Sequence, residues 1–156
     1  MIIQKLKSLL LRGHRSPLYE VYTDGSYKHG RGSWAFVILK DGKILKESSG
    51  AARRTTCTRM EFQAAIEALQ VLPENVEVIF YTDSRILVDT MTLWLQEWKD
   101  YGWVKKNDRP IPGVDQMQIL DQLSQDRKIQ WKWIKAHSGI VHNERCDELC
   151  IAARTI

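Results

Sequence analysis

The order of strand-like and helix-like segments constrains the fold of this chain more than any other feature of its sequence. Leu18–Thr23 is rich in β-branched and aromatic residues and runs into Asp24-Gly25-Ser26, which is typical of a turn. Trp34–Leu39 and Ile44–Ser48 flank Asp41-Gly42, and Asp-Gly between two such segments is a strong hairpin signal. The chain is therefore predicted to open with three antiparallel strands.

Helical and extended patterns alternate after this hairpin. Thr55 or Thr56 can cap a helix that follows helical spacing from Met60 to Leu72 and stops at Pro73. The nearly continuous apolar segment Val76–Tyr81 predicts a buried strand. The remaining predicted elements are helices around 84–100 and 114–125, a strand at Lys128–Ile134 and a helix at Asn143–Arg154. This order predicts an α/β fold, one five-stranded mixed sheet flanked by helices in a single domain over 18–156.

The first 17 residues predict a separate basic N-terminal arm. Their apolar stretch is short, is interrupted by Lys and Arg, and is followed by no small-residue cleavage site, so we expect no secretory leader. No run in the sequence reaches the ~18–20 apolar residues of a membrane span. We expect a cytoplasmic protein, and a contact of the arm with a membrane surface or nucleic acid remains an alternative.

Charge and cysteine usage narrow the function classes. With 23 Lys and Arg against 19 Asp and Glu the net charge is +4, which allows a polyanionic partner without requiring one. Cys57, Cys146 and Cys150 form neither a disulfide framework nor the paired spacing of a zinc site. Cys146 and Cys150 lie four apart in a predicted helix, which favours apolar packing.

Four carboxylates are candidates for chemistry. Asp24 and Asp83 each follow a threonine where a predicted strand ends, so two parallel neighbouring strands would place both at one carboxyl edge. Helix capping by Asp83 is an alternative role. Glu61 shares a helical stripe with apolar residues, where a charge is rarely left without a partner or a cation. Asp147 lies in the second turn of the last helix, where stabilisation of the helix dipole is an equally good explanation.

Carboxylates that converge repel one another unless a cation neutralises them. Oxygen ligands favour Mg²⁺ or Mn²⁺, and two such ions can activate a water and stabilise the leaving oxygen in phosphodiester cleavage. The pattern therefore predicts a metal-dependent nuclease if the four residues meet, which their spacing alone does not establish.

Six motifs in order resemble the bacterial type 1 ribonuclease H family along nearly the whole chain, from Tyr19 to Ala153. They are Tyr22–Ser26, Arg54–Glu61, Tyr81–Ser84, the tryptophans and lysines from Trp94 to Trp103, Trp133–Gly139 and Asn143–Leu149. The resemblance implies a monomeric endonuclease that hydrolyses the RNA strand of RNA–DNA hybrids. It implies two Mg²⁺ ions, with Mn²⁺ as a substitute, and 3′-hydroxyl and 5′-phosphate products.

The resemblance also implies roles for individual residues. Asp24, Glu61, Asp83 and Asp147 match the catalytic metal ligands, with Asp24 bridging both ions. His137 matches a catalytic histidine on a mobile loop that assists proton transfer or product release. Glu144 matches an auxiliary acidic residue near the site.

Residues that match the family's hybrid-binding positions fall into three groups. The minor-groove set is Gly25, Ser26, Cys57, Thr58 and Ser84, and Asn143 is a further substrate-binding position. Thr56 and Arg59 match the side of the DNA-strand phosphates. The basic protrusion is matched by Trp94, Trp98, Lys99, Trp103, Lys105 and Lys106, although the tryptophans could instead simply pack the helix.

Several departures from the family pattern affect substrate binding more than chemistry. The segment Tyr27–Ser33 is predicted to be a short loop without the usual Asn-Pro-Gly, and Cys57 and Thr58 replace two side-chain amides. Within the segment from Trp94 to Arg109, acidic residues reduce the net charge to +1.

Alternative functions are a catalytically silent hybrid-binding module, an integrase-like or transposase-like enzyme, or a detached reverse-transcriptase domain. The complete acidic set and the helix motifs favour the ribonuclease.

Overall fold

The computed structural model describes residues 17–155, so the predicted arm lies outside the described residues except for Pro17. The elements in chain order are β1 (Leu18–Lys28), β2 (Arg31–Lys40), β3 (Lys43–Arg53), α2 (Cys57–Val71), β4 (Glu77–Thr82), α3 (Arg85–Asp89), the π-helical turn η1 (Thr90–Trp94), α4 (Leu95–Asp100), α5 (Val114–Gln125), β5 (Lys128–Trp133) and α6 (Val141–Arg154). No helix within 17–155 is long and apolar enough to cross a membrane.

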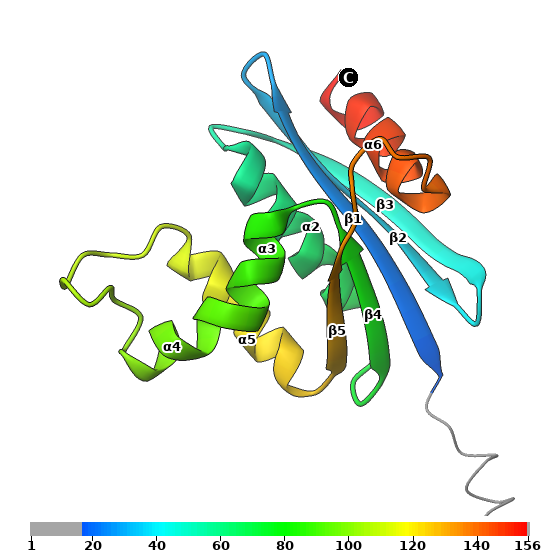
Figure 1. The fold of residues 1–156 in the computed structure, drawn as a ribbon. Coiled ribbons are helices and arrows are strands. Elements are labelled where there is room, and N and C mark those ends of the chain that lie inside the picture. The colour runs from blue at the N-terminus through cyan, green and yellow to red at the C-terminus, as the bar shows by residue number, and fades with distance from the viewer. Residues whose placement is uncertain (1–16, 156) are drawn as a thin grey trace, which may run out of the picture.

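The five strands form one mixed sheet in the order β3-β2-β1-β4-β5 (Figure 1). β1, β2 and β3 pair antiparallel, whereas β4 is parallel to both β1 and β5. Thr23 of β1 is aligned with Thr82 of β4. The predicted mixed sheet and the predicted parallel pairing of the two Thr-Asp strands are therefore confirmed.

The prediction that β1 ends at Asp24 was wrong. β1 continues to Lys28, and Asp24 pairs with Ala35 of β2 in the middle of a long hairpin. The reversal occurs at His29-Gly30, where both residues have positive φ of 53° and 78°. Since β2 supplies backbone partners along the whole segment, Asp24-Gly25-Ser26 is extended and 27–33 is mostly strand rather than loop.

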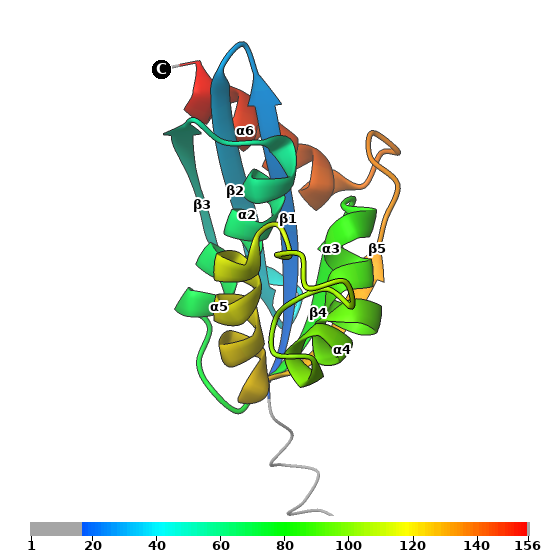
Figure 2. The same cartoon turned by 90° about the vertical axis from the view of Figure 1, so that its left-hand side faces the viewer.

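Helices cover the two faces of the sheet unequally (Figures 1 and 2). α2, α3 and α5 lie on one face, where Val21, Phe36 and Phe80 enter the main core. α6 packs on β1, β2 and β3 on the opposite face, and its Cys146 and Cys150 are fully buried there. The two thiols are free, which agrees with the packing role predicted for them.

The predicted burial of β4 holds for only one of its faces. Val78 and Phe80 are buried, but Ile79 and Tyr81 are only half-buried. The reason is that α6 packs mainly on the other three strands, so this face of β4 stays open. The alternation follows from the pleat of the strand.

Local capping explains where the helices begin. The Thr56 hydroxyl accepts a hydrogen bond of 3.1 Å from the backbone N of Arg59 and so caps α2, as predicted. Ser84, and not Asp83, caps α3 by accepting 3.2 Å from the N of Leu87. The capping alternative for Asp83 is therefore wrong, and its carboxylate is available for another role.

Candidate active site

Three of the four predicted carboxylates converge at the carboxyl edge of β4. Asp24 lies within β1, Asp83 directly follows β4, and Glu61 lies near the N-terminus of α2. Each of them offers one oxygen, and these three atoms lie within 4.8 Å of one another. Residues far apart in sequence thus form one cluster of hard oxygen ligands.

The close approach of α2 to β1 depends on a residue without a side chain. A Cβ on Gly25 would overlap the backbone N of Glu61 and would lie 2.5 Å from the carbonyl carbon of Met60. Gly25, assigned above to minor-groove binding, is therefore also the position at which helix and strand backbones touch. Its small size brings the Asp24 and Glu61 carboxylates together.

The environment of the cluster favours neutral carboxyl groups when no cation is present. Burial, followed by the charges of Asp83 and Asp147, raises the pKa of Asp24 to about 8. Burial also raises the pKa of Glu61 to about 7, although a hydrogen bond from Ser84 acts in the opposite direction. The pKa of Asp83 is raised, again mainly by burial.

A divalent cation would remove this repulsion, since it stabilises the charged form of every ligand at once. Converging, partly buried carboxylate oxygens without a paired Lys or Arg within the described residues are the donor set that Mg²⁺ and Mn²⁺ prefer. The residues present therefore fit the metal that the family resemblance implies.

Asp147 lies beside the cluster rather than inside it. Its charge raises the pKa of both Asp24 and Asp83, which places it within electrostatic range of the two carboxylates. It projects from α6, the only element of the site that packs on the opposite face of the sheet in the described structure. Asp147 could therefore contribute a further oxygen ligand if a cation were bound at this edge.

Two residues of α6 stabilise neighbouring parts of the site. Asn143 is buried, and its side-chain amide donates a hydrogen bond of 3.3 Å to Oδ2 of Asp83, which lowers the pKa of that carboxyl group. Oε1 of Glu144 accepts 3.1 Å from the backbone N of Gly139 in the loop between β5 and α6. His137 lies in this loop with φ 53°, and its charge also lowers the pKa of Asp83.

Three residues assigned to the minor groove, Gly25, Cys57 and Ser84, contact the carboxylate cluster. Sγ of Cys57 lies 3.5 Å from the backbone O of Gly25 and 4.0 Å from Oε1 of Glu61. Partial burial, followed by the charges of Glu61 and Asp24, raises the pKa of this thiol to about 11. Ser26 accepts a hydrogen bond of 3.2 Å from Nε of Arg154, and Ser84 is the buried cap described above.

Arg59, assigned to the DNA-strand side, is held by an acidic partner. Its guanidinium donates to both carboxylate oxygens of Asp115 at 3.2 and 2.8 Å. Gln116 donates to the backbone O of Arg59 at 2.9 Å and joins the same helix ends, α2 and α5. Sequence reasoning missed both partners, because neither lies near Arg59 in the chain.

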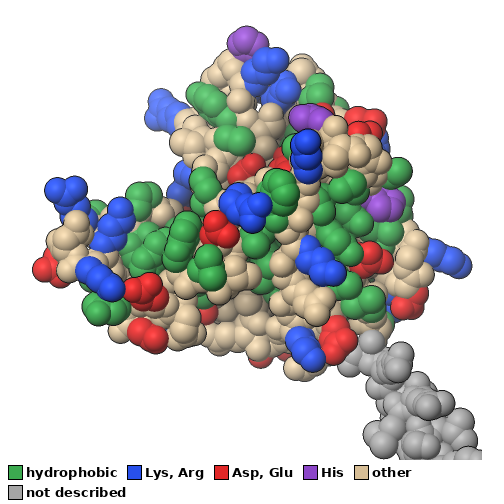
Figure 3. All heavy atoms as spheres, in the orientation of Figure 1, with side chains coloured by type: hydrophobic (Ala, Val, Ile, Leu, Met, Phe, Trp, Pro, Cys, Tyr) green, Lys and Arg blue, Asp and Glu red, His purple; other side chains and the backbone are tan. Residues whose placement is uncertain are grey.

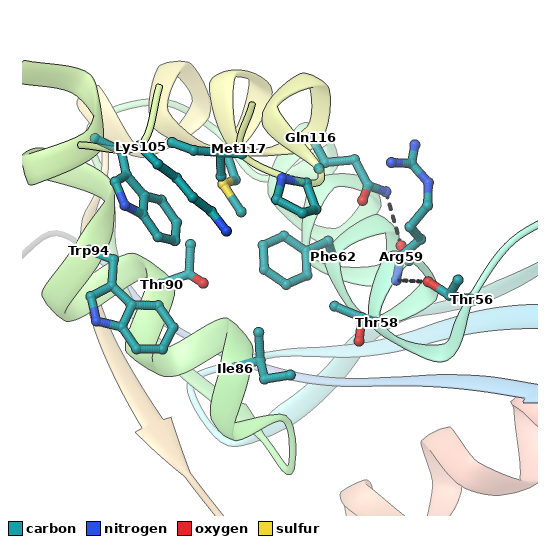
Figure 4. Close-up of a pocket in the computed structure, with 14 residues that line it drawn as sticks. Thr56, Thr58, Arg59, Phe62, Ile86, Thr90, Trp94, Lys105, Gln116 and Met117 are labelled. Atoms are coloured by element: carbon teal, nitrogen blue, oxygen red, sulfur yellow. Dashed lines mark hydrogen bonds between the residues drawn. The ribbon is translucent and has the colours of Figure 1, made fainter. Parts of the chain in front are cut away.

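A cavity of about 600 Å³ lies next to Arg59 (Figure 4). It is lined by six residues of the predicted binding set, namely Thr56, Thr58, Arg59, Trp94, Trp98 and Lys105. Apolar side chains from α2, α3 and α5, including Phe62, Ile86 and Met117, complete its wall. Sequence reasoning did not find these three, since each looks like an ordinary core residue on its helix.

The protrusion formed by α4 and the following loop is less basic than its lysines suggest. Lys99 pairs with Asp121 at 3.0 Å, and Lys106 pairs with Glu97 at 3.4 Å. Figure 3 shows Lys and Arg side chains interspersed with Asp and Glu at this end of the molecule. Trp98 and Trp103 pack against the core, which agrees with the structural alternative for them, whereas Trp94 remains 37% exposed.

Comparisons with known proteins agree with this geometry. The RNase H family model matches residues 17–155. The chain is 43% identical over 136 residues to the ribonuclease H of Erythrobacter litoralis, covering 86% of this chain and 94% of that protein. It is 41% identical over 135 residues to the ribonuclease H of Klebsiella pneumoniae, covering 86% and 87%.

A solved structure, that of LC9-RNase H1, described as a type 1 RNase H with the type 2 active-site motif, shares the fold with a TM-score of 0.79. It is 28% identical in sequence, and the match covers 90% of this chain and 73% of that one. A family match over nearly the whole chain and relatives above 40% identity leave no other assignment: this chain belongs to the ribonuclease H family.

Proposed function

We propose that this ribonuclease H hydrolyses the RNA strand of RNA–DNA hybrids at the carboxylate cluster and leaves 3′-hydroxyl and 5′-phosphate ends. The observation that carries the proposal is the convergence of Asp24, Glu61 and Asp83 within 4.8 Å at one edge of the sheet. The raised pKa values of these groups support it, because such a cluster is electrostatically unfavourable unless it binds cations.

Four residues would hold two Mg²⁺ ions, for which Mn²⁺ can substitute: Asp24, Glu61, Asp83 and Asp147. When bound, such ions lower the pKa of a water and stabilise the leaving oxygen in phosphodiester hydrolysis. The protein contributes the fixed positions of the ligands. Gly25 keeps Glu61 close to Asp24, and Asn143 orients Asp83 through its hydrogen bond.

His137 would serve proton transfer at the leaving oxygen or the release of product. Its loop is held against α6 by the hydrogen bond between Glu144 and Gly139. The charge of the histidine lowers the pKa of Asp83, so the two side chains interact electrostatically. The two ring nitrogens of an imidazole can accept or donate a proton, which suits either task. Glu144 accordingly has a positioning role for this loop.

The hybrid would lie across the carboxylates with its DNA strand toward α2, α5 and the protrusion. The cavity beside Thr56 and Arg59 and the exposed Trp94 support this orientation, because aromatic and cationic groups suit sugars and phosphates. RNA is distinguished by its 2′-hydroxyl, which the short polar groups Ser26, Cys57 and Thr58 can approach. Following the family, we also propose that the enzyme acts as a monomer in the cytoplasm.

A cleavage assay tests the function directly. RNA–DNA hybrid, duplex RNA and single-stranded RNA of one sequence are incubated with the protein with and without Mg²⁺, and the ends are analysed. We expect cleavage of the hybrid alone, only with the metal, and loss of cleavage in Asp24→Asn. Equal cleavage of all three substrates, or normal turnover by Asp24→Asn with intact fold, would contradict the proposal.

A further inference from the structure

Trp133 connects the end of β5 to the metal-ligand segment. It is the last residue of β5 and is aligned with Thr82, the residue before Asp83. Its indole Nε1 donates a hydrogen bond of 3.0 Å to the backbone O of Asp83. The residue is 41% exposed although this hydrogen bond fixes it at the edge of the sheet.

Arg85 covers one face of the Trp133 ring. It is the first residue of α3, two residues after Asp83, and its guanidinium lies over the Trp133 ring at 4.3 Å from the centroid. A guanidinium that stacks on an aromatic face keeps its N–H donors directed outward in one plane. Trp133 therefore restricts an exposed cation to one orientation beside the carboxylate cluster.

The cation has no acidic partner that would neutralise it. No carboxylate within residues 17–155 forms an ion pair with Arg85, in contrast to Arg59, Lys99, Lys106 and Arg145. An RNA strand whose cleaved phosphodiester lies on the carboxylates continues past the cluster on either side. On the β5 side it meets this oriented guanidinium, whose geometry suits two oxygens of one phosphate.

We propose that Arg85, held flat on Trp133, binds a backbone phosphate of the RNA strand adjacent to the phosphodiester that is cleaved. The inference rests on the proposed function, since it takes the carboxylate cluster as the cleavage site. It gives Trp133 a positioning role and adds a cation on the β5 side of the site.

Binding of a labelled hybrid is measured in the cleavage-deficient Asp24→Asn background at several NaCl concentrations. Adding Arg85→Gln should raise Kd roughly tenfold at low salt, the loss expected for one charge-assisted contact. The slope of log Kd against log salt should fall by about 0.7–0.9, as for one phosphate contact. Lys43→Gln, which removes one exposed charge from the turn at the far end of β2 and β3, is the matched control and should change neither quantity.

Two further variants separate charge from orientation. Arg85→Lys keeps the charge but not the planar fork, so the salt slope should stay at the wild-type value while Kd rises a few-fold. In the cleavage-competent protein, Arg85→Gln should raise KM and leave kcat within about twofold. A Kd and a salt slope unchanged by Arg85→Gln overturn the proposal, as does a loss confined to kcat.

Failure of the proposed function gives a different result. In that case the wild-type protein does not cleave the hybrid selectively, whatever the Arg85 variants do. Thermal unfolding of each variant verifies that the fold is intact before the binding data are compared.

Discussion

The side-chain amide of Asn143 donates a hydrogen bond of 3.3 Å to Oδ2 of Asp83 across 60 residues of sequence. This contact joins α6 to the carboxyl end of β4 and fixes one oxygen of a proposed metal ligand. The family resemblance assigned Asn143 to substrate binding, whereas its burial and its partner indicate that it orients the ligand.

Replacing Asn143 should therefore weaken the metal site. Loss of a residue that orients a metal ligand commonly reduces metal affinity or activity by about 10–100-fold. We expect Asn143→Ala to lower kcat at fixed Mg²⁺ by roughly tenfold or more, and to raise the Mg²⁺ concentration needed for half-maximal activity. If KM rises while the Mg²⁺ dependence is unchanged, Asn143 binds the substrate instead of orienting the metal ligand.

The stability of the metal-free protein should depend on pH through Asp24. Burial raises the pKa of Asp24 from 3.8 to about 8, so the folded protein binds this proton more tightly than the unfolded chain does. The resulting contribution to the free energy of unfolding is complete below the unfolded pKa and is lost as pH rises from there to about 8. Asp24→Asn should therefore stabilise the protein at pH 8 in EDTA, by at least about 1 kcal/mol or roughly 2–4 °C in Tm. The difference should disappear near pH 4.

Thermal unfolding at both pH values measures this effect, and Asp41→Asn in the β2–β3 turn serves as the control for loss of one carboxylate. Saturating Mg²⁺ should stabilise the wild type at pH 8 and not Asp24→Asn. A destabilised Asp24→Asn at pH 8 without metal would contradict the repulsion inferred for the cluster.

Gly25→Ala should damage both stability and activity. The added Cβ overlaps the backbone N of Glu61, and overpacking of this kind costs about 1–3 kcal/mol. Displacement of α2 would also move the Glu61 carboxylate, so kcat should fall by more than tenfold even where the protein is folded. Gly30→Asn, at a positive-φ turn with open space around it, should have little effect on either.

The two neighbouring lysines of the protrusion should contribute unequally to hybrid binding. Lys105 lines the cavity and points toward it (Figure 4), whereas Lys106 pairs with Glu97 and lies near the Tyr101 ring. We expect Lys105→Gln to raise Kd several-fold and flatten its salt dependence by about one phosphate. Lys106→Gln should change Kd and its salt dependence less. A larger effect of Lys106→Gln than of Lys105→Gln would show that Lys105 does not contact the hybrid.

His137→Ala should slow turnover without removing the metal. The histidine is not one of the clustered oxygen ligands, and its proposed task is proton transfer or product release. We expect kcat to fall by about 10²-fold while Mg²⁺ affinity, followed by thermal stabilisation, stays within a few-fold. Complete loss of metal binding would contradict this role.

Much of the local structure was determined by signals a few residues apart. The hairpin at Asp41-Gly42, the helix that Thr56 caps and the helix Val114–Gln125 all appear where the sequence predicts them. Turn geometry, capping and helical spacing each act over four residues or fewer, so neighbouring side chains are sufficient to specify them. The apolar helical stripe that includes Glu61 likewise indicates, from sequence alone, that this charge has a partner or a cation.

Pairing across the sheet decided what those local signals could not. The sequence Asp24-Gly25-Ser26 has the composition of a turn, but β2 lies beside it and holds it extended. The convergence of Asp24, Glu61 and Asp83, the contact of Asn143 with Asp83, and the position of Arg85 on Trp133 join distant segments. No short-range pattern encodes such contacts. They exist because the parallel pairing of β1 with β4 and the close packing of α2 on Gly25 bring these side chains to one edge.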